Sequence, residues 1–166
     1  MKDKLRLLLF EECNHKCPGC CNNDWDLKSL EVCTDFSPYR LVMLTGGEPM
    51  LHPDVIRSAV KDIRAQSDAK IYLYTAMTDG LDEILPIIDG LTLTLHNPKD
   101  KMNLRWFELS SKNLIDLSQR GSLRLNIFRE AGTMPDVSDI WKVKSDMVWI
   151  PDCPLPTGEV LMRYHK

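Results

Sequence analysis

Six short runs of apolar residues recur along the chain, and they limit its fold more than any other feature of the sequence. They lie at 5–11, 41–44, 71–74, 91–95, 123–128 and 147–150. Several are almost continuous in Leu, Val, Ile and Tyr, which is typical of parallel strands covered on both faces. Helical or loop segments separate the runs, so the sequence predicts an α/β fold with a mainly parallel sheet. Six strands are too few for a closed eight-stranded barrel, which leaves an open sheet or a partial barrel.

Three segments between these runs have helical character. Residues 52–67 place Pro53 in a first turn and apolar residues on one face. Residues 79–90 show helical spacing, but Pro86 should shorten or bend a helix there. Residues 107–121 form the third candidate, which should end near Gly121.

Composition bounds the class of protein. With 166 residues, 43% of them hydrophobic, we expect one domain over residues 1–166 with a core of its own. A formal net charge of −3 gives no electrostatic reason to expect a nucleic acid or an anionic membrane as partner. Residues 7–10 are too short an apolar run to cross a membrane, and no signal-peptide cleavage site follows them, so we expect a cytoplasmic protein. In a reducing compartment, six cysteines are more commonly ligands or free thiols than disulfides.

Polar, glycine-rich or cysteine-containing segments follow nearly every predicted strand. They are the segment from Cys13, the Thr-Gly-Gly-Glu-Pro segment 45–49, and the segments that begin at Thr75, His96 and Pro151. Ligands of open α/β sheets and of (β/α) barrels bind at the carboxyl ends of the strands. The sequence therefore predicts a ligand site at this edge of the sheet.

Cys13, Cys17 and Cys20 form a Cys-x-x-x-Cys-x-x-Cys triplet after the first run. A structural zinc site prefers four ligands. The candidates for the fourth are Cys21, Cys33 and His15. A thioredoxin-like pair of Cys17 and Cys20 would leave Cys13 unexplained. A four-iron cluster on three thiolates leaves one iron open to a second molecule.

The triplet, followed about 25 residues later by Gly-Gly-Glu-Pro after the second run, resembles the radical S-adenosylmethionine (radical SAM) superfamily. The resemblance implies a partial (β/α)6 barrel, a [4Fe–4S] cluster held by Cys13, Cys17 and Cys20, and S-adenosylmethionine on the open iron. Two glycines let a backbone approach a ligand closely, and Glu48 offers an acceptor for an ammonium group. The implied cofactor-binding residues are Thr45, Gly46, Gly47, Glu48, Pro49, Thr75, Arg124, Asn126 and Ile150.

Arg124 and Asn126 share one face of the run 123–128, because successive side chains of a strand point to opposite faces. On an open sheet they would face solvent. In a partial barrel with its helices outside, they would point inward to the cofactor.

The resemblance implies an enzyme in which the reduced cluster passes one electron to S-adenosylmethionine. The resulting 5′-deoxyadenosyl radical would remove a hydrogen atom from a substrate, which is a small molecule or a peptide. Such an enzyme needs an external one-electron reductant, flavodoxin- or ferredoxin-like, and its cluster would be oxygen-sensitive. Two further residues, His96 and Cys153, are catalytic candidates because each follows a predicted strand on the ligand edge.

Two alternative functions stay open at this point. The segments "CNHKCPGC" and "GGEPMLHPDV" are most similar to the small activases of anaerobic ribonucleotide reductase, which implies a glycyl-radical protein as substrate. The other alternative is a non-catalytic iron–sulfur or zinc module. The Gly-Gly-Glu-Pro segment argues against that module, because an electron carrier needs no methionine-binding turn.

Overall fold

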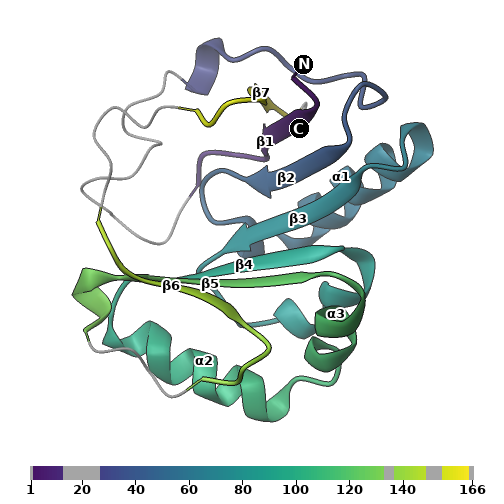
Figure 1. The fold of residues 1–166 in the computed structure, drawn as a ribbon. Coiled ribbons are helices and arrows are strands. Elements are labelled where there is room, and N and C mark those ends of the chain that lie inside the picture. The colour runs from purple at the N-terminus through teal and green to yellow at the C-terminus, as the bar shows by residue number, and fades with distance from the viewer. Residues whose placement is uncertain (1, 13–26, 133–136, 149–154, 165–166) are drawn as a thin grey trace.

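The chain folds around one sheet of parallel strands (Figure 1). The computed structural model describes residues 2–12, 27–132, 137–148 and 155–164. The strands are β1 (Lys4–Leu8), β2 (Leu41–Thr45), β3 (Lys70–Thr75), β4 (Gly90–Leu95), β5 (Ser122–Phe128), β6 (Lys142–Met147) and β7 (Glu159–Arg163). Their order across the sheet is β6-β5-β4-β3-β2-β1-β7, and every neighbouring pair is parallel. The prediction of an α/β fold with a mainly parallel, unclosed sheet is confirmed, and this arrangement is compatible with a partial barrel.

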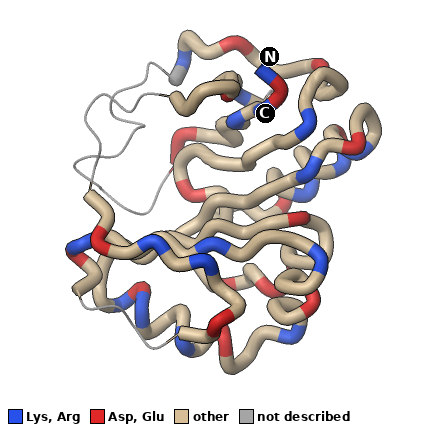
Figure 2. Tube along the Cα trace, in the orientation of Figure 1, with Lys and Arg blue, Asp and Glu red and all other residues tan. Residues whose placement is uncertain are grey.

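The two faces of the sheet differ in character. On β5, Leu123, Leu125 and Ile127 are buried, whereas Arg124 is exposed and Asn126 is half-buried. The same alternation on β1 buries Leu5 and Leu7 and leaves Arg6 between them half-buried. Figure 2 shows that charged residues occur along β5 and β6, at one end of the sheet.

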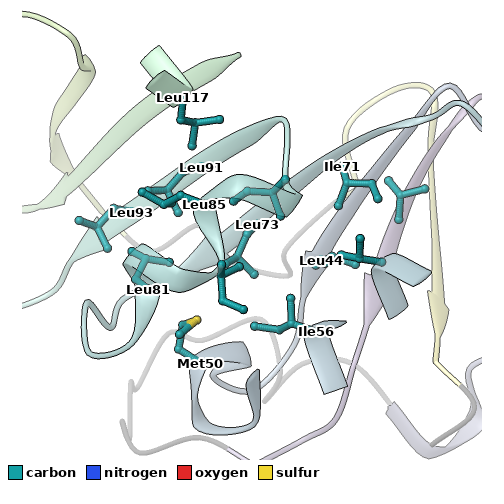
Figure 3. Packing of buried hydrophobic residues seen from close by; sticks show 14 of the residues in the cluster. Leu44, Met50, Ile56, Ile71, Leu73, Leu81, Leu85, Leu91, Leu93 and Leu117 are labelled. Carbon is teal, nitrogen blue, oxygen red and sulfur yellow. The ribbon is translucent and has the colours of Figure 1, made fainter. Parts of the chain in front are cut away.

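Three helices pack on the apolar face of the sheet. They are α1 (Pro53–Gln66), α2 (Pro98–Ser110) and α3 (Leu114–Arg120). Their buried residues belong to one hydrophobic cluster with the inward-facing leucines and isoleucines of the strands (Figure 3). Ile56 of α1, Leu104 of α2 and Leu117 of α3 are members of this cluster. Because all three helices contribute to the same cluster, they cover the same face. The other face carries no α-helix formed by the described residues, and we call it the helix-free face.

The helix predicted at 52–67 is confirmed, since α1 begins at Pro53 and ends at Gln66. The α-helix predicted at 79–90 is wrong, because the segment is helical but not α-helical. That segment forms two short 3-10 helices, η4 (Leu81–Glu83) and η5 (Leu85–Ile87), with Pro86 inside the second. Proline removes a backbone donor and obstructs the preceding turn, so a continuous α-helix does not form. Three further 3-10 helices are η2 (Leu27–Ser29), η3 (Pro49–Leu51) and η6 (Arg129–Ala131).

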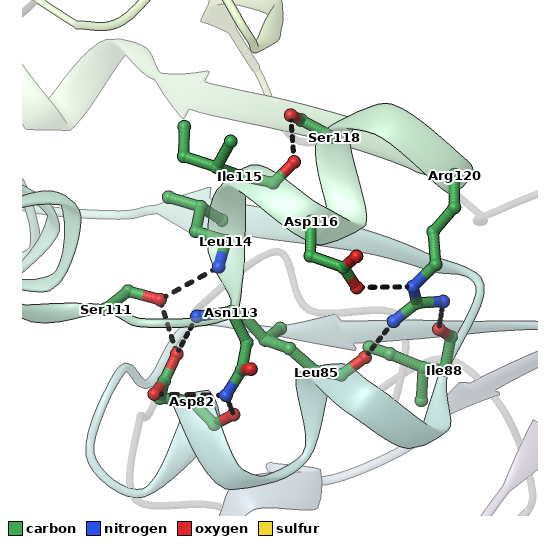
Figure 4. Close-up of polar contacts among 10 residues, drawn as sticks. All are labelled: Asp82, Leu85, Ile88, Ser111, Asn113, Leu114, Ile115, Asp116, Ser118 and Arg120. Carbon is green, nitrogen blue, oxygen red and sulfur yellow. Dashed lines mark hydrogen bonds and ion pairs between the residues drawn. The ribbon is translucent and has the colours of Figure 1, made fainter.

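The single helix predicted at 107–121 is also wrong, because its residues belong to two helices, α2 and α3. The carboxylate of Asp82 causes the break (Figure 4). It accepts hydrogen bonds from the Ser111 hydroxyl, from Lys112 N at 3.1 Å and from Asn113 N at 3.0 Å. The backbone N–H groups of Lys112 and Asn113 therefore leave the helical ladder, and α3 then ends at Gly121 as predicted.

The sixth strand was predicted at 147–150 but lies earlier, at Lys142–Met147. Lys142, Lys144 and Ser145 are exposed there, because β6 is an edge strand. The continuous apolar run typical of a buried parallel strand is therefore missing. The seventh strand, β7, was not predicted, and it pairs with β1 from Lys4↔Glu159 to Leu8↔Arg163.

Candidate functional site at the carboxyl edge of the sheet

All strands run in the same direction, so the segments that follow them meet at one edge. The segment 45–49 begins at Thr45, the last residue of β2, and continues with a tight turn at Gly46 and Gly47. Their φ angles are +87° and +54°, a region that only glycine enters readily. Both glycines are thus required by the backbone of the turn itself.

The Gly46–Gly47 turn lies against the segment that follows β1. A Cβ atom on Gly47 would overlap the carbonyl oxygen of Glu12, and Glu48 N donates to that same oxygen at 2.8 Å. A Cβ atom on Gly46 would overlap the side chain of Leu8. The glycines were predicted to allow a ligand to approach, and in the structure their close neighbour is the protein's own backbone. The turn is therefore attached to Glu12, the residue directly before Cys13.

The side chain of Glu48 is buried, with 3% of its surface exposed. Its Oε2 accepts hydrogen bonds from Met50 N at 2.8 Å and from Thr75 Oγ1 at 2.7 Å, and its Oε1 accepts one from Ala76 N at 2.7 Å. Glu48 thus caps the 3-10 helix that starts at Pro49 and joins the ends of β2 and β3. Its predicted contact with an ammonium group stays a prediction.

Thr75 is the last residue of β3 and is 4% exposed. Its hydroxyl donates to Glu48 and accepts a hydrogen bond from Met77 N at 3.0 Å. The structure therefore brings together two residues predicted for one site. The predicted contact of Thr75 with a cofactor stays a prediction.

His96 lies at the junction of β4 and α2, farther along the same edge. Its backbone N donates to the Asp100 carboxylate at 2.7 Å, and its ring stacks on Phe128 at the end of β5, with centroids 5.2 Å apart. Asn97 caps α2 by accepting from Asp100 N at 3.0 Å. These contacts fix the ring at the carboxyl ends of β4 and β5.

Arg124 and Asn126 lie on the helix-free face of β5, as their spacing predicted. They pair in register with Thr92 and Thr94 of β4. Thr75 is in register with Leu93 of β4, and Leu93 is in register with Leu125, so Arg124 and Asn126 lie at about the level of Thr75 with β4 between them. Their predicted contact with a cofactor stays a prediction.

Several predicted residues lie outside the described residues. They are Cys13, Cys17, Cys20, Ile150 and Cys153, together with His15 and Cys21. Within the described part of the chain, no group of three histidine, cysteine or acidic residues could hold a metal ion. Cys33 is 1% exposed in the core, and burial raises the pKa of its thiol, so it is an ordinary core residue.

Sequence reasoning missed Glu12 and its neighbours. The Glu12 carboxylate lies 3.3 Å from Nε2 of His52, and the His52 and Phe10 rings make a T-shaped contact. These residues come from segments far apart in the sequence, so no local pattern indicates the contact. The capping role of Glu48 did have a signal, because an acidic residue directly before a proline is typical of a helix N-terminus.

Comparison with known proteins gives one partial similarity. No protein-family model matches the chain. The chain is 35% identical over 101 residues to a GTP 3′,8-cyclase from Microcystis aeruginosa, and the match covers 50% of this chain and 30% of that protein. The match thus spans under a third of the relative's length. Among the described residues, no helix is long and apolar enough to pass through a lipid bilayer.

Proposed function

We propose that this chain is a radical SAM enzyme, with a [4Fe–4S] cluster on Cys13, Cys17 and Cys20 and S-adenosylmethionine as cofactor. The observation that carries the proposal is the seating of the Gly46–Gly47 turn on Glu12. It joins the Gly-Gly-Glu-Pro segment to the start of the cysteine segment at the carboxyl edge of a parallel sheet. The similarity to a GTP 3′,8-cyclase, which is a radical SAM enzyme, supports the same superfamily.

The donor set fits these groups. Three thiolates suit an iron–sulfur cluster with one open iron. Each carboxylate oxygen can accept about two hydrogen bonds, and Oε1 of Glu48 accepts one among the described contacts, so it can receive an ammonium donor as well. When bound, the two groups together supply a carbon-centred radical that abstracts a hydrogen atom.

The protein's own residues hold and orient these groups. The Gly46–Gly47 turn fixes the entry of the cysteine segment, and Thr75 and Ala76 N hold the Glu48 carboxylate in place. The hard chemistry belongs to the cofactors, and the fold supplies ligation and orientation.

The substrate is not carried over from the relative, because the match covers only 30% of that protein. The resemblance of "CNHKCPGC" and "GGEPMLHPDV" to the ribonucleotide reductase activases keeps a glycyl-radical protein as the second candidate substrate. A flavodoxin- or ferredoxin-like protein is the proposed reductant.

One anaerobic experiment tests the proposal. The cluster is reconstituted and reduced, S-adenosylmethionine is added, and 5′-deoxyadenosine is quantified. We expect cleavage by the wild-type chain, and no cluster and no cleavage for Cys17→Ala. Cys33→Ala is the matched control and should retain both, because Cys33 is a core residue. An intact four-iron protein that cleaves no S-adenosylmethionine under active reductant would contradict the proposal.

A further arm separates the substrate classes. An anaerobic ribonucleotide reductase is added after cleavage has been shown, and the sample is examined for a glycyl-radical resonance. A resonance that depends on S-adenosylmethionine would establish the activase function, and its absence would favour a small molecule or a peptide.

A further inference from the structure

Three cationic side chains lie together on the helix-free face at the β5–β6 end of the sheet. Arg124 of β5 is in register with Lys142 of β6, and Asn126 is in register with Lys144. Each pair shares a face, because residues in register on neighbouring parallel strands point the same way. Arg124, Lys142 and Lys144 are all exposed. We call these three residues the β5–β6 cation cluster.

The cluster contrasts with Arg6, an arginine on the same face at the other end of the sheet. Arg6 of β1 forms an ion pair with Glu159 of β7 at 2.8 Å, and its guanidinium lies over the Tyr74 ring, 5.3 Å from the centroid. By comparison, no carboxylate among the described residues lies within ion-pair distance of the β5–β6 cation cluster. The only acidic residue of β4, β5 and β6 is Asp146, and it pairs with Arg129 at 3.0 Å.

This arrangement costs stability, because like charges directly opposite on neighbouring strands repel each other. Lysines on an edge strand do have another use, since they prevent association between sheets. That use accounts for Lys142 and Lys144 on β6, which is the edge strand. It does not account for Arg124, which lies on the inner neighbour of that strand.

From these observations we infer that the β5–β6 cation cluster binds the substrate through a multiply charged anionic group of the phosphate class. An arginine presents two parallel donors to such a group, and lysines add point charges. Asn126 and Thr94 lie in the next row of the same face and add neutral polar groups. The assignment of the anion to the substrate rests on the proposed function, whereas anion binding itself does not.

The experiment must show whether the β5–β6 cation cluster binds a phosphate-class anion or the cofactor, since S-adenosylmethionine also carries a carboxylate. The full chain, reconstituted anaerobically, is titrated by calorimetry with inorganic tripolyphosphate and separately with S-adenosylmethionine. The test variant is Arg124→Gln/Lys142→Gln/Lys144→Gln. The control is Lys61→Gln/Lys99→Gln/Arg105→Gln, which removes the same charge from exposed positions of α1 and α2 on the opposite side.

We expect the wild-type chain to bind tripolyphosphate saturably and the test variant to bind it about tenfold more weakly or worse. The control should lose less than about twofold, since screening limits the effect of distant charges. Affinity for S-adenosylmethionine should be unchanged in the control, and it is measured in the test variant as well because Arg124 is also a predicted contact of that cofactor. Arg124→Lys keeps the charge and should lose less than Arg124→Gln.

Three results would overturn the inference: no binding of tripolyphosphate, an equal loss in the test and control variants, or a loss confined to S-adenosylmethionine. All six positions are exposed, so we expect both triple variants to fold, which their melting temperatures check. Formation of 5′-deoxyadenosine is measured on the same samples. Cleavage without anion binding would refute this inference alone, and anion binding without cleavage would refute the proposed function alone.

Discussion

At the scale of single residues, the Gly46–Gly47 turn is where the sequence allows least change. Gly47 has a positive φ and no room for a Cβ atom beside the Glu12 carbonyl. We expect Gly47→Ala to lower the free energy of unfolding by about 2–5 kcal/mol, from backbone strain and overlap together. Urea denaturation followed by circular dichroism measures the change.

Gly80 provides the control for Gly47. It also has a positive φ, of +73°, but a Cβ atom there would meet only the Met50 methyl group at 3.7 Å. Gly80→Ala should therefore cost only the strain, about 1–2 kcal/mol. Equal losses in the two variants would show that the contact with Glu12 is unimportant.

Glu48 gives a second prediction at this scale. Both of its carboxylate oxygens accept hydrogen bonds from the protein. In Glu48→Gln the amide NH2 must face at least one of these donors, which should cost about 1–3 kcal/mol of stability. Denaturation of this variant is compared with that of Glu130→Gln, at an exposed position, where we expect a change below about 0.5 kcal/mol. A Glu48→Gln protein as stable as wild type would remove the structural role assigned here.

At the scale of elements, Asp82 connects the η4 segment to the α2–α3 junction (Figure 4). Burial acts to raise the pKa of this carboxyl, but hydrogen bonds from Ser111, Asn113 and Lys112 outweigh it and hold the pKa below its usual value. A carboxyl with a lowered folded-state pKa stabilises the protein above its unfolded-state pKa, near 4, and loses that contribution as the pH falls through the folded-state value.

Asp89 behaves in the same way. Burial acts against its charge, and the hydrogen bond from Arg64 at 2.7 Å, with one from Ile71 N at 2.9 Å, lowers its pKa. We therefore expect the urea midpoint to fall as the pH drops below about 4. Asp82→Asn should be less stable than wild type at neutral pH and should show a flatter pH profile. An unchanged profile would contradict the assignment.

The elements also show what local sequence could predict. Helix α1 was predicted correctly because its proline start and its apolar face are both local features. The break between α2 and α3 was missed because Asp82, about 30 residues earlier, accepts hydrogen bonds from the backbone N–H groups of Lys112 and Asn113. Strand β6 was predicted at the wrong residues, because an exposed edge strand lacks the apolar run by which buried strands are recognised.

At the candidate site the same limit applies. The sequence predicted that the residues after β2 and β3 would meet, and Glu48 and Thr75 do meet. It did not predict that Glu12 receives the Gly46–Gly47 turn, because that contact joins two loops from different strands.

At the scale of the whole molecule, the last described segment, residues 155–164, packs against the start of the chain: β7 pairs with β1, and Tyr164 contacts α1. Tyr164 follows β7, is 1% exposed, and its hydroxyl bonds to the Asp62 carboxylate and to Ser58 Oγ at 2.9 Å. Tyr164→Phe leaves these partners without that hydroxyl and should cost about 1–3 kcal/mol. Tyr39→Phe is the comparison and should cost less, since within the described part of the chain the Tyr39 hydroxyl bonds only to the sulfur of Met162, at 3.5 Å. Thermal unfolding of the two variants decides between them.

The pairing of β7 with β1 has a consequence for the order of folding. Lys4 and its partner Glu159 are 155 residues apart in the sequence. During synthesis β1 emerges first, and its outer edge stays open until residues 159–163 have left the ribosome. Contacts between such distant segments form late and leave an unprotected edge in the meantime. Amide protons of β1 should therefore be among the last in the sheet to gain protection in pulse-labelled refolding.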